Sequence, residues 1–210
     1  MFMPVQDTES VRGISSRRTG WRTRGFRLWL TMMALAWALS AIPCLWAQSP
    51  KPSDYQVKAA YLYNFGRFVE WPTGVATAKS ESFTVCVLGE DPFGAILDAT
   101  LAGETIAGKK VVAQRISTPQ ESINCQILFL GAAEASRLNK IVADLDKVAV
   151  LTVSDMPQFA RRGGMIQFVL EGNRVRFEVN LTATQHAGLT LRSDLLKVAI
   201  AVRRNPGGAD

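Results

Sequence analysis

The chain has 210 residues, of which 48% are hydrophobic and 20% charged, and its formal net charge is +6. This composition is that of an ordinary globular domain, and it excludes intrinsic disorder, collagen-like repeats and a polytopic membrane protein. The charge is uneven, because residues 1–47 hold six arginines and two acidic residues, whereas the rest holds 18 basic and 16 acidic residues. A nearly neutral body excludes a general nucleic-acid-binding function.

The first 47 residues have the layout of a secretory signal peptide. Basic residues end at Arg27, no charged residue lies between 28 and 47, and Pro43 interrupts the apolar stretch. We predict cleavage after Ala47. The alternative is an uncleaved inner-membrane anchor, because an uncharged stretch of this length can span a bilayer of about 30 Å. In both cases the sequence predicts the export of a single domain, residues 48–210.

Two cysteines, Cys86 and Cys125, remain after removal of the leader. An exported domain meets an oxidising compartment, so we predict one disulfide bond between them. Closing a loop of about 40 residues stabilises a fold by about 3 to 4 kcal/mol. The alternative is a pair of buried free thiols.

The first part of the body alternates predicted helices and strands. A helix begins at Ser53 or Asp54 and ends at Trp71, because a residue that precedes proline is disfavoured in helices. The continuous apolar run 83–88 predicts a strand that is buried on both faces. Further strands are predicted at 109–116, 125–130 and 148–153, and helices from Pro92 to about Leu101 and over 132–145. This alternation predicts a parallel α/β sheet.

After residue 164 the pattern changes. Two strand-like runs, 165–170 and 175–179, are separated by a Glu-Gly-Asn-Arg sequence that predicts a tight antiparallel hairpin. Residues 181–202 have apolar residues at helical spacing and predict a closing amphipathic helix.

The predicted fold class is α/β: a mostly parallel sheet flanked by helices, a Rossmann-like or flavodoxin-like sandwich, with an added antiparallel C-terminal hairpin and a closing helix. If the strand order is 2-1-3, the first and third strands are neighbours, which would bring Cys86 and Cys125 within bridging range.

The body is poor in catalytic residues. Its single histidine, His186, lacks the evident partners that a histidine-based metal site or triad requires. Residues 89–94, between a strand and a helix, lack the Lys and Ser/Thr of a phosphate loop, and their two carboxylates would repel a phosphate. We therefore predict that the protein is not an enzyme and has no catalytic residue, no metal and no cofactor.

The segment 154–164 follows the predicted fourth strand. The segment is predicted to form a capped short helix, which the pair Gly163 and Gly164 would end because glycine adopts positive φ. As a structural element, the segment returns the chain into the hairpin. As a functional element, it is a loop for a ligand or partner at the carboxyl end of the sheet, where open α/β sheets bind.

The first predicted helix is rich in aromatic residues. Most of them belong to the core, but Tyr55 and Tyr63 do not share the stripe of Tyr61, Phe65 and Phe68. An exposed aromatic patch on this helix would be a partner surface.

Several sequence blocks together resemble the YfiR family of bacterial periplasmic proteins. The blocks are 55–72 (YQVKAAYLYNFGRFVEWP), 86–89 with 92–93 (CVLG and PF), 125–129 (CQILF), 154–166 with its Ser-Asp and Gly-Gly pairs, and the ending at 180–199. In this order they cover essentially the whole predicted mature chain.

The resemblance implies regulation rather than catalysis. The best understood members are periplasmic repressors that bind the periplasmic sensory domain of an inner-membrane diguanylate cyclase and hold it inactive, so that release raises cyclic di-GMP and favours biofilm growth. Members are redox-sensitive through a disulfide, and Cys86 and Cys125 fall where the family's pair falls. A second pair found in some members has no counterpart here. Many relatives sit beside sensor kinases or outer-membrane receptors instead.

Two hypotheses follow. The first is a periplasmic inhibitor that docks on a membrane-anchored diguanylate cyclase through its aromatic first helix and its closing-helix surface. The second is a periplasmic receptor for a small ligand that feeds a sensor kinase or a transport system. No nucleic acid is expected as a partner, and a homodimer stays open. The candidate residues for binding a partner or ligand are Tyr63, Arg67, Asp155, Gly163, Gly164, Asn173, Arg176 and Arg192.

Overall fold

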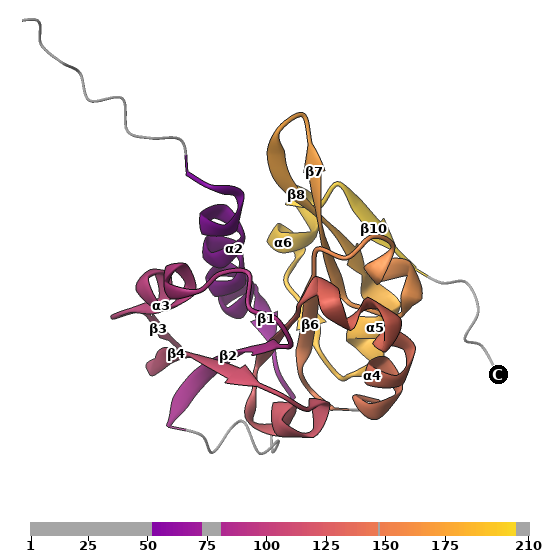
Figure 1. The fold of residues 1–210 in the computed structure, drawn as a ribbon. Helices are drawn as coiled ribbons and strands as arrows, with labels where there is room; N and C mark the ends of the chain where they lie inside the picture. The colour runs from indigo at the N-terminus through magenta and orange to yellow at the C-terminus, as the bar shows by residue number, and fades with distance from the viewer. Residues whose placement is uncertain (1–51, 73–80, 147, 205–210) are drawn as a thin grey trace, which may run out of the picture. The chain divides into compact units, whose positions relative to one another are not determined.

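The structure, a computed structural model, describes residues 52–72, 81–146 and 148–204. The strands are β1 (Val69–Glu70), β2 (Ser82–Leu88), β3 (Thr105–Ile106), β4 (Lys109–Ile116), β5 (Ile127–Leu130), β6 (Leu151–Ser154), β7 (Ile166–Glu171), β8 (Arg174–Asn180), β9 (Thr190–Leu191) and β10 (Ala201–Arg203). The helices are α2 (Asp54–Phe68), α3 (Ala95–Leu101), α4 (Leu138–Asp144), α5 (Leu181–His186) and α6 (Ser193–Val198), with 3₁₀ helices η2 (Pro119–Asn124), η3 (Ala132–Ser136) and η4 (Phe159–Arg162). Figure 1 shows their arrangement.

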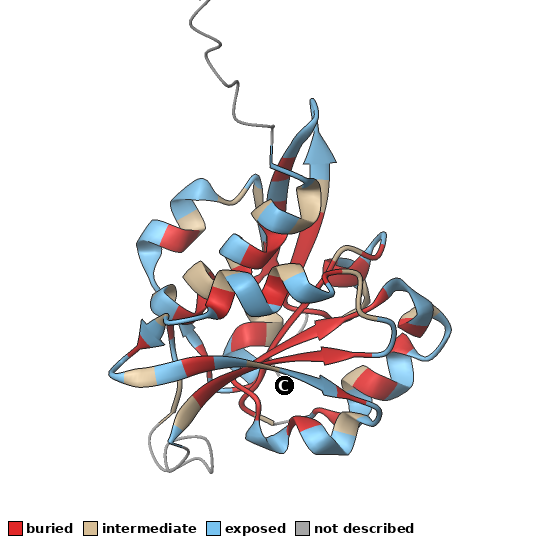
Figure 2. Cartoon of the chain, turned by 60° about the vertical axis from the view of Figure 1, so that its left-hand side comes forward, coloured by how far each residue is buried: buried red, intermediate tan, exposed pale blue. Residues whose placement is uncertain are grey.

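The main sheet is mostly parallel, as predicted. Its eight strands have the order β10-β8-β7-β6-β5-β2-β4-β3, and β1 and β9 form a separate antiparallel pair. The first three predicted strands, β2, β4 and β5, therefore lie in the predicted order 2-1-3. Buried side chains from α2 and α3 pack on one face and those from α4 on the other. Strands with buried residues run between the two layers (Figure 2), so the α/β sandwich is confirmed.

The first helix, α2, is fixed at its N-terminus and on its inner face. Ser53 caps it, because its side chain accepts a hydrogen bond from the Gln56 N–H while the Gln56 side chain accepts one from the Ser53 N–H. Further along, the Phe65 ring stacks on Phe168 at 5.8 Å and meets Phe177 edge to face at 5.1 Å. Such pairs add about 0.5 to 1.5 kcal/mol each beyond simple burial. They hold α2 against the β7–β8 hairpin.

The disulfide lies on the opposite face of the sheet. Cys86 and Cys125 are bonded, with their Cα atoms 5.9 Å apart. Both are buried with residues of α4 such as Leu138, whereas Val85 and Val87, the neighbours of Cys86 in β2, belong to the core under α2. The predicted disulfide and the predicted burial of this strand on both faces are confirmed, and the alternative of free thiols is wrong.

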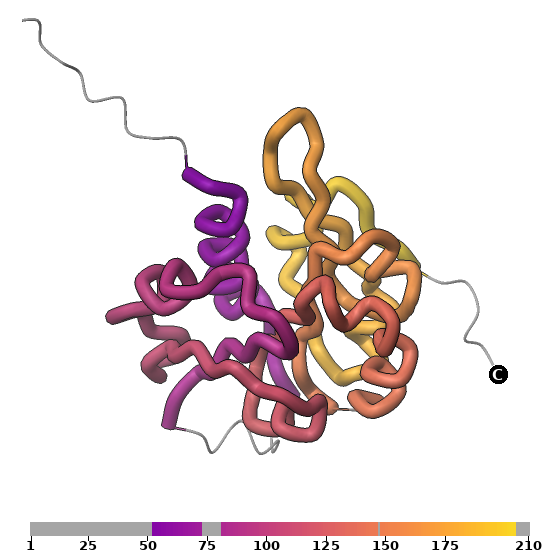
Figure 3. Tube along the Cα trace, viewed as in Figure 1, coloured from indigo at the N-terminus to yellow at the C-terminus, as the bar shows by residue number. Residues whose placement is uncertain are grey.

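The predicted hairpin is present. Glu171 pairs with Arg174, so Gly172 and Asn173 alone form the turn, with φ of 53° and 62°. Two left-handed residues make a type I′ turn, which Gly and Asn tolerate best. The hairpin extends beyond the rest of the sheet (Figures 1 and 3).

The prediction of a single closing helix over 181–202 is wrong. The chain forms α5, β9, α6 and β10 in succession. Gly188, with φ of 74°, follows the end of α5, after which β9 pairs with β1 and β10 adds to the sheet beside β8. Three of the apolar residues at helical spacing, Leu189, Leu191 and Leu195, are buried in the core under α2, whereas Val198 is exposed.

Three other helices are shorter than predicted. Helix α3 begins at Ala95 rather than at Pro92, because Gly94 has a φ of 53° and the Asp91 side chain accepts a hydrogen bond from the Phe93 N–H in the preceding bend. The helix predicted over 132–145 divides into η3 and α4. Helix α2 ends at Phe68, since the next two residues pair with β9.

The predicted signal peptide, residues 1–47, lies outside the described residues. Its cleavage after Ala47 and the domain boundary there stay predictions. Within the described ranges, no helix is both long enough and apolar enough to cross a bilayer.

Reduction of the disulfide should lower the free energy of unfolding by about 3 to 4 kcal/mol, because the unfolded chain regains the freedom that the bond between residues 39 apart removes. Urea unfolding with and without reductant measures this difference. The Cys86→Ala/Cys125→Ala variant is the control, and its stability should not respond to reductant. Equal stability of the oxidised and reduced wild type would contradict the expectation.

Candidate functional site

The crevice expected at the carboxyl ends of the central strands is filled. Helices after β2 and after β5 pack on opposite faces, and ligands of open α/β sheets bind between the ends of such strands. A Cβ on Gly131 would lie 2.5 Å from the Glu90 carbonyl oxygen, and one on Gly89 would lie 2.6 Å from Glu134 Oε1. Glu134 is buried and paired with Arg137. In this part of the described chain, the loops that follow the two strands are therefore closely packed against each other.

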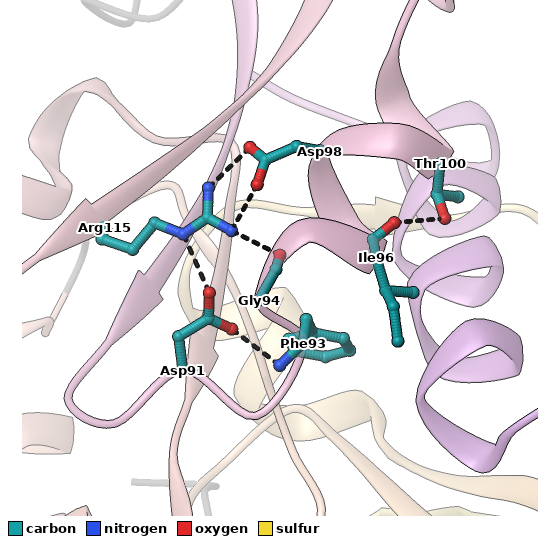
Figure 4. A network of polar contacts seen from close by, with 7 residues as sticks. All are labelled: Asp91, Phe93, Gly94, Ile96, Asp98, Thr100 and Arg115. Atoms are coloured by element: carbon teal, nitrogen blue, oxygen red, sulfur yellow. Dashed lines mark hydrogen bonds and ion pairs between the residues drawn. The ribbon is translucent and has the colours of Figure 1, made fainter.

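Arg115 of β4 holds the loop that follows β2 (Figure 4). Its guanidinium donates two parallel hydrogen bonds to Asp98, of 2.6 and 2.8 Å, one to Asp91 at 2.9 Å and one to the Gly94 carbonyl oxygen at 2.8 Å. Bidentate contacts of this kind are among the stronger polar interactions in proteins. The hydrogen bond from Arg115 is the main cause of the lowered pKa of Asp98. The network connects the loop, β4 and α3.

Asp155, the candidate that follows β6, is paired inside the protein. Its Oδ2 accepts a hydrogen bond from Lys58 Nζ at 2.6 Å and a longer one from the Tyr55 hydroxyl at 3.4 Å. The side chains of Lys58 and Asp155 are only 8% and 18% exposed. Burial, and then the charge of Asp155, raise the pKa of Tyr55. This ion pair holds the N-terminal half of α2 at the carboxyl end of the sheet.

Gly163 and Gly164 have structural roles. Gly163 ends η4 with a φ of 99°, and a Cβ on Gly164 would lie 2.2 Å from the Phe159 ring. The predicted short helix is present as η4 (Phe159–Arg162), which Gly163 ends, but no side chain caps its N-terminus. Ser154 Oγ instead accepts a hydrogen bond from the Met156 N–H in a local turn.

Three candidates gather at the C-terminal end of α2. The Arg67 guanidinium lies 5.9 Å from the centre of the Tyr63 ring, and that of Arg192 lies 5.8 Å from the Phe68 ring. A hydrogen bond to Glu104 is the main cause of the raised pKa of Tyr63. These contacts place Tyr63, Arg67 and Arg192 near one another but far along α2 from the Asp155 pair.

The remaining candidates, Asn173 and Arg176, lie on the β7–β8 hairpin. Asn173 occupies the turn, and Arg176 is exposed and 4.0 Å from Glu171. The candidate residues thus lie at the carboxyl end of β6, at the end of α2 and on the hairpin, and the structure does not gather them into one site.

The aromatic side chains of α2 mostly face inward. Tyr55 packs edge to face on Phe93 at 5.5 Å, and Tyr61 packs on Phe177 at 5.5 Å. Tyr63 is half-buried. The described part of α2 therefore does not present the large exposed aromatic patch that the sequence left open.

A cavity of about 650 Å³ lies at the opposite end of the sheet, where β2 and β4 begin and α2 ends. Its lining residues are Gly66, Arg67, Val69, Glu70, Trp71, Pro72, Phe83, Thr105, Ile106, Ala107, Lys109 and Gln126. Only Arg67 is among the sequence candidates. The sequence offers no signal for this cavity, because its walls come from segments that are distant in the chain.

Lys58 and Arg115 were also not predicted as site residues. Lys58 stands four residues before Leu62 and seven before Phe65, on the buried stripe of α2, and this spacing of a lysine could have indicated a buried partner. Arg115 carries no such signal, since its partners Asp98 and Asp91 lie 17 and 24 residues earlier.

Metal-ligating side chains do not cluster in the described ranges, where no group of three or more His, Cys, Asp or Glu residues is suitably placed. His186 lies on the surface, with its Nε2 atom 2.7 Å from Asp146 Oδ1.

The model of the family described as YfiR/HmsC-like matches residues 55–200, from the first turn of α2 to the residue before β10. The chain belongs to the YfiR/HmsC-like family. The resemblance read from the sequence blocks is confirmed. Members of this family are periplasmic and regulatory rather than catalytic, and membership supports a periplasmic regulator of diguanylate cyclase signalling.

Two solved structures resemble this chain at low identity. A conserved domain protein from Vibrio cholerae O1 biovar El Tor is 12% identical, with a TM-score of 0.43 over 57% of this chain and 54% of its own. The ABC domain from Streptococcus pneumonia, in complex with L-Trp, is 12% identical, with a TM-score of 0.50 over 69% of this chain and 60% of its own. This chain thus spans little more than half of either structure. The second likeness supports the α/β fold.

Replacing Arg115 with glutamine should lower the stability and change its pH dependence. Because Arg115 lowers the folded-state pKa of Asp98, the network stabilises the fold above the unfolded carboxyl pKa of about 4, and this contribution is lost as the pH falls through the lower folded value. We expect Arg115→Gln to cost about 1 kcal/mol at pH 7, since the pair is partly solvated, and less towards pH 3.

Urea unfolding of both proteins from pH 7 to pH 3 measures this gap. Lys140→Gln is the matched control, because its pair with Asp144 is exposed and one helical turn away, so its removal should change little. A gap for Arg115→Gln that stays constant with pH would contradict the role of Asp98.

Proposed function

We propose that the protein inhibits an inner-membrane diguanylate cyclase from the periplasmic side and so lowers cyclic di-GMP. The observation that carries this proposal is the family match over residues 55–200, which includes both cysteines of the disulfide. The mechanism is a population shift: the inhibitor binds the inactive state of the cyclase more tightly than the active state. About 5.5 kcal/mol of differential affinity moves a two-state receptor from almost entirely active to almost entirely inactive.

The disulfide makes this inhibition sensitive to redox conditions. Cys86 lies in β2 and Cys125 two residues before β5, so the bond joins β2 to the segment that leads into its neighbouring strand, inside the core under α4. Reduction removes a large share of the stability of a domain that has about 5 to 15 kcal/mol in all. A less stable inhibitor unfolds more often and is removed more readily by proteases, so repression of the cyclase is weakened.

The surface that we propose for docking is the end of the sheet formed by β7, β8, β10 and α6. Residues 161–204 carry eight Lys and Arg against three Asp and Glu, whereas residues 52–160 carry nine against twelve. Most of the exposed large apolar side chains of the described chain also lie at this end: Leu170, Val198, Ile200 and Val202. A basic surface with apolar side chains fits an acidic surface on the sensory domain of the cyclase.

The strand register places part of this apolar area on one face of the sheet. Leu170 is opposite Val175 in the hairpin, and Val202 lies beside Val179 in the β8–β10 pair. Since Val175 and Val179 are separated by an even number of residues in β8, all four side chains point to the same face.

Deletion of the protein should raise cyclic di-GMP several-fold and increase biofilm growth, because the inhibited cyclase becomes active. Mass-spectrometric quantification of cyclic di-GMP in the deletion strain and in a strain complemented with the wild type measures the effect. Complementation with Cys86→Ala/Cys125→Ala should restore repression only in part. An unchanged level in the deletion strain would count against the proposed function.

Arg174→Glu should weaken repression without unfolding the protein, because the side chain is exposed on the hairpin and its reversal places a negative charge against an acidic partner. Lys110→Glu is the matched control, an exposed lysine at the opposite end of the sheet. Cyclic di-GMP levels and pulldown of the cyclase from membranes report the effect. Equal repression by the two variants would show that the hairpin is not part of the docking surface.

A further inference from the structure

The cavity at the amino ends of β2 and β4 has the size and lining of a binding site for a small molecule. Its volume of about 650 Å³ falls within the range of ligand pockets, about 300 to 1,000 Å³. Apolar side chains from three elements form much of the wall, among them Val69, Phe83 and Ile106. An apolar body of moderate size can be buried here.

The polar groups of the lining are mostly hydrogen-bond donors. Arg67 and Lys109 contribute positive charges, against one carboxylate from Glu70. Gln126 is only 4% exposed, and its carbonyl oxygen already accepts a hydrogen bond of 2.5 Å from the Thr84 N–H. The part of that amide left for other contacts is its NH₂ group, which only donates. A lining with more donors than acceptors favours an anionic group on the ligand.

Trp71 provides an independent observation. Its ring lines the cavity and packs edge to face on Phe83 at 5.3 Å. Its indole Nε1 is buried, and no atom of the protein accepts its hydrogen bond in the described part of the chain. Leaving a buried donor unsatisfied destabilises a protein, so such a group calls for an explanation. Because Nε1 has almost no accessible surface, the ring must turn before an acceptor on a ligand in this cavity can reach it and remove this cost.

We propose that this cavity binds a small organic anion, a carboxylate with an aliphatic or arylalkyl body. The apolar body packs on Val69, Phe83 and Ile106, and the carboxylate is held by Arg67 and by the donors of Trp71 and Gln126. This site is separate from the docking surface on the β7–β8 hairpin, and it goes beyond the proposed function because it does not require that the partner be a cyclase.

The first experiment titrates 4-phenylbutyrate and octanoate, and their uncharged primary amides, into purified protein expressed from the full chain. The readouts are the thermal midpoint and the ¹⁵N–¹H resonance of the Trp71 indole, assigned by its loss in Trp71→Phe. We expect the carboxylates to raise the midpoint and shift this resonance, and the amides to bind about tenfold more weakly or worse. Equal binding of acids and amides, or no binding of either acid, would overturn the proposal.

Two variants locate the site. Arg67→Gln should weaken binding of the acids about tenfold and leave the amides unaffected, while Arg161→Gln, an exposed arginine on η4, should bind as the wild type does. Trp71→Phe keeps a ring against Phe83 but removes the unsatisfied donor. It should be at least as stable as the wild type without ligand, yet bind the acids several-fold more weakly.

These variants separate a binding role from a structural one. A merely structural Trp71 would make Trp71→Phe less stable or leave binding unchanged, and either result contradicts the proposal. Full-strength binding in both Arg67→Gln and Trp71→Phe would place the ligand elsewhere. Cyclic di-GMP levels are not a readout here, so failure of this proposal and failure of the proposed function remain distinguishable.

Discussion

Burial of β2 on both faces is the constraint on which the rest of the structure depends. Its alternate side chains enter different cores: Val85 and Val87 lie under α2, and Cys86 and Leu88 lie under α4. A strand of this kind is stable only if helices cover both sides of the sheet. It also fixes where the disulfide can form. Cys86 points into the core under α4, and Cys125, close to the start of β5, lies in the same core. The burial of β2 on both faces thus explains both the α/β sandwich and the position of the disulfide.

The charge of the domain shows that a residue composition does not reveal how charges are distributed. A body with 18 basic and 16 acidic residues is nearly neutral, which is the basis for expecting no nucleic acid as a partner. The same total hides a separation along the chain, with basic residues in excess after residue 160. Because β7, β8 and β10 are consecutive at one end of the sheet, a separation in sequence becomes a separation in space. The strand order is what turns the separation of charge along the chain into a separation of charge in space.

Local sequence predicted those elements whose formation depends on local chemistry. The buried strands, the capped start of α2 at Ser53 and the Gly172-Asn173 turn each follow from residue types at adjacent positions. The segment 181–202 was misjudged because helical spacing of apolar residues says that they are buried and not how. Here Leu189, Leu191 and Leu195 are buried in or beside β9 and in α6, whereas β10 lies at the edge of the sheet. The pairing partners of β9 and β10, which are β1 and β8, are supplied by tertiary structure. The spacing of apolar residues within the segment carries no information about those pairing partners.

The candidate site was less predictable than the fold, for the same reason. Asp155 was correctly placed at the carboxyl end of a strand, where ligands often bind, but Lys58 from the opposite end of the domain's sequence neutralises it. At the switch point, Glu90 and Glu134 fill the space that the fold class reserves for a ligand. The open cavity lies instead at the amino ends of the strands, and residues from four distant segments line it. Fold class alone therefore points to the wrong edge of this sheet.

The cavity and the disulfide share one short piece of backbone. Gln126 lines the cavity and follows Cys125 directly, and it binds Thr84 twice, through its side-chain oxygen and through its own N–H. Its carbonyl oxygen accepts a hydrogen bond from Leu151 at the start of β6. Cys86 lies two residues beyond Thr84. Cys125 is thus joined to the wall of the cavity by one peptide bond, and two hydrogen bonds join Gln126 to Thr84 in the strand that carries Cys86. By linkage, a ligand that prefers the oxidised geometry must make the disulfide harder to reduce by the same factor by which reduction weakens its binding.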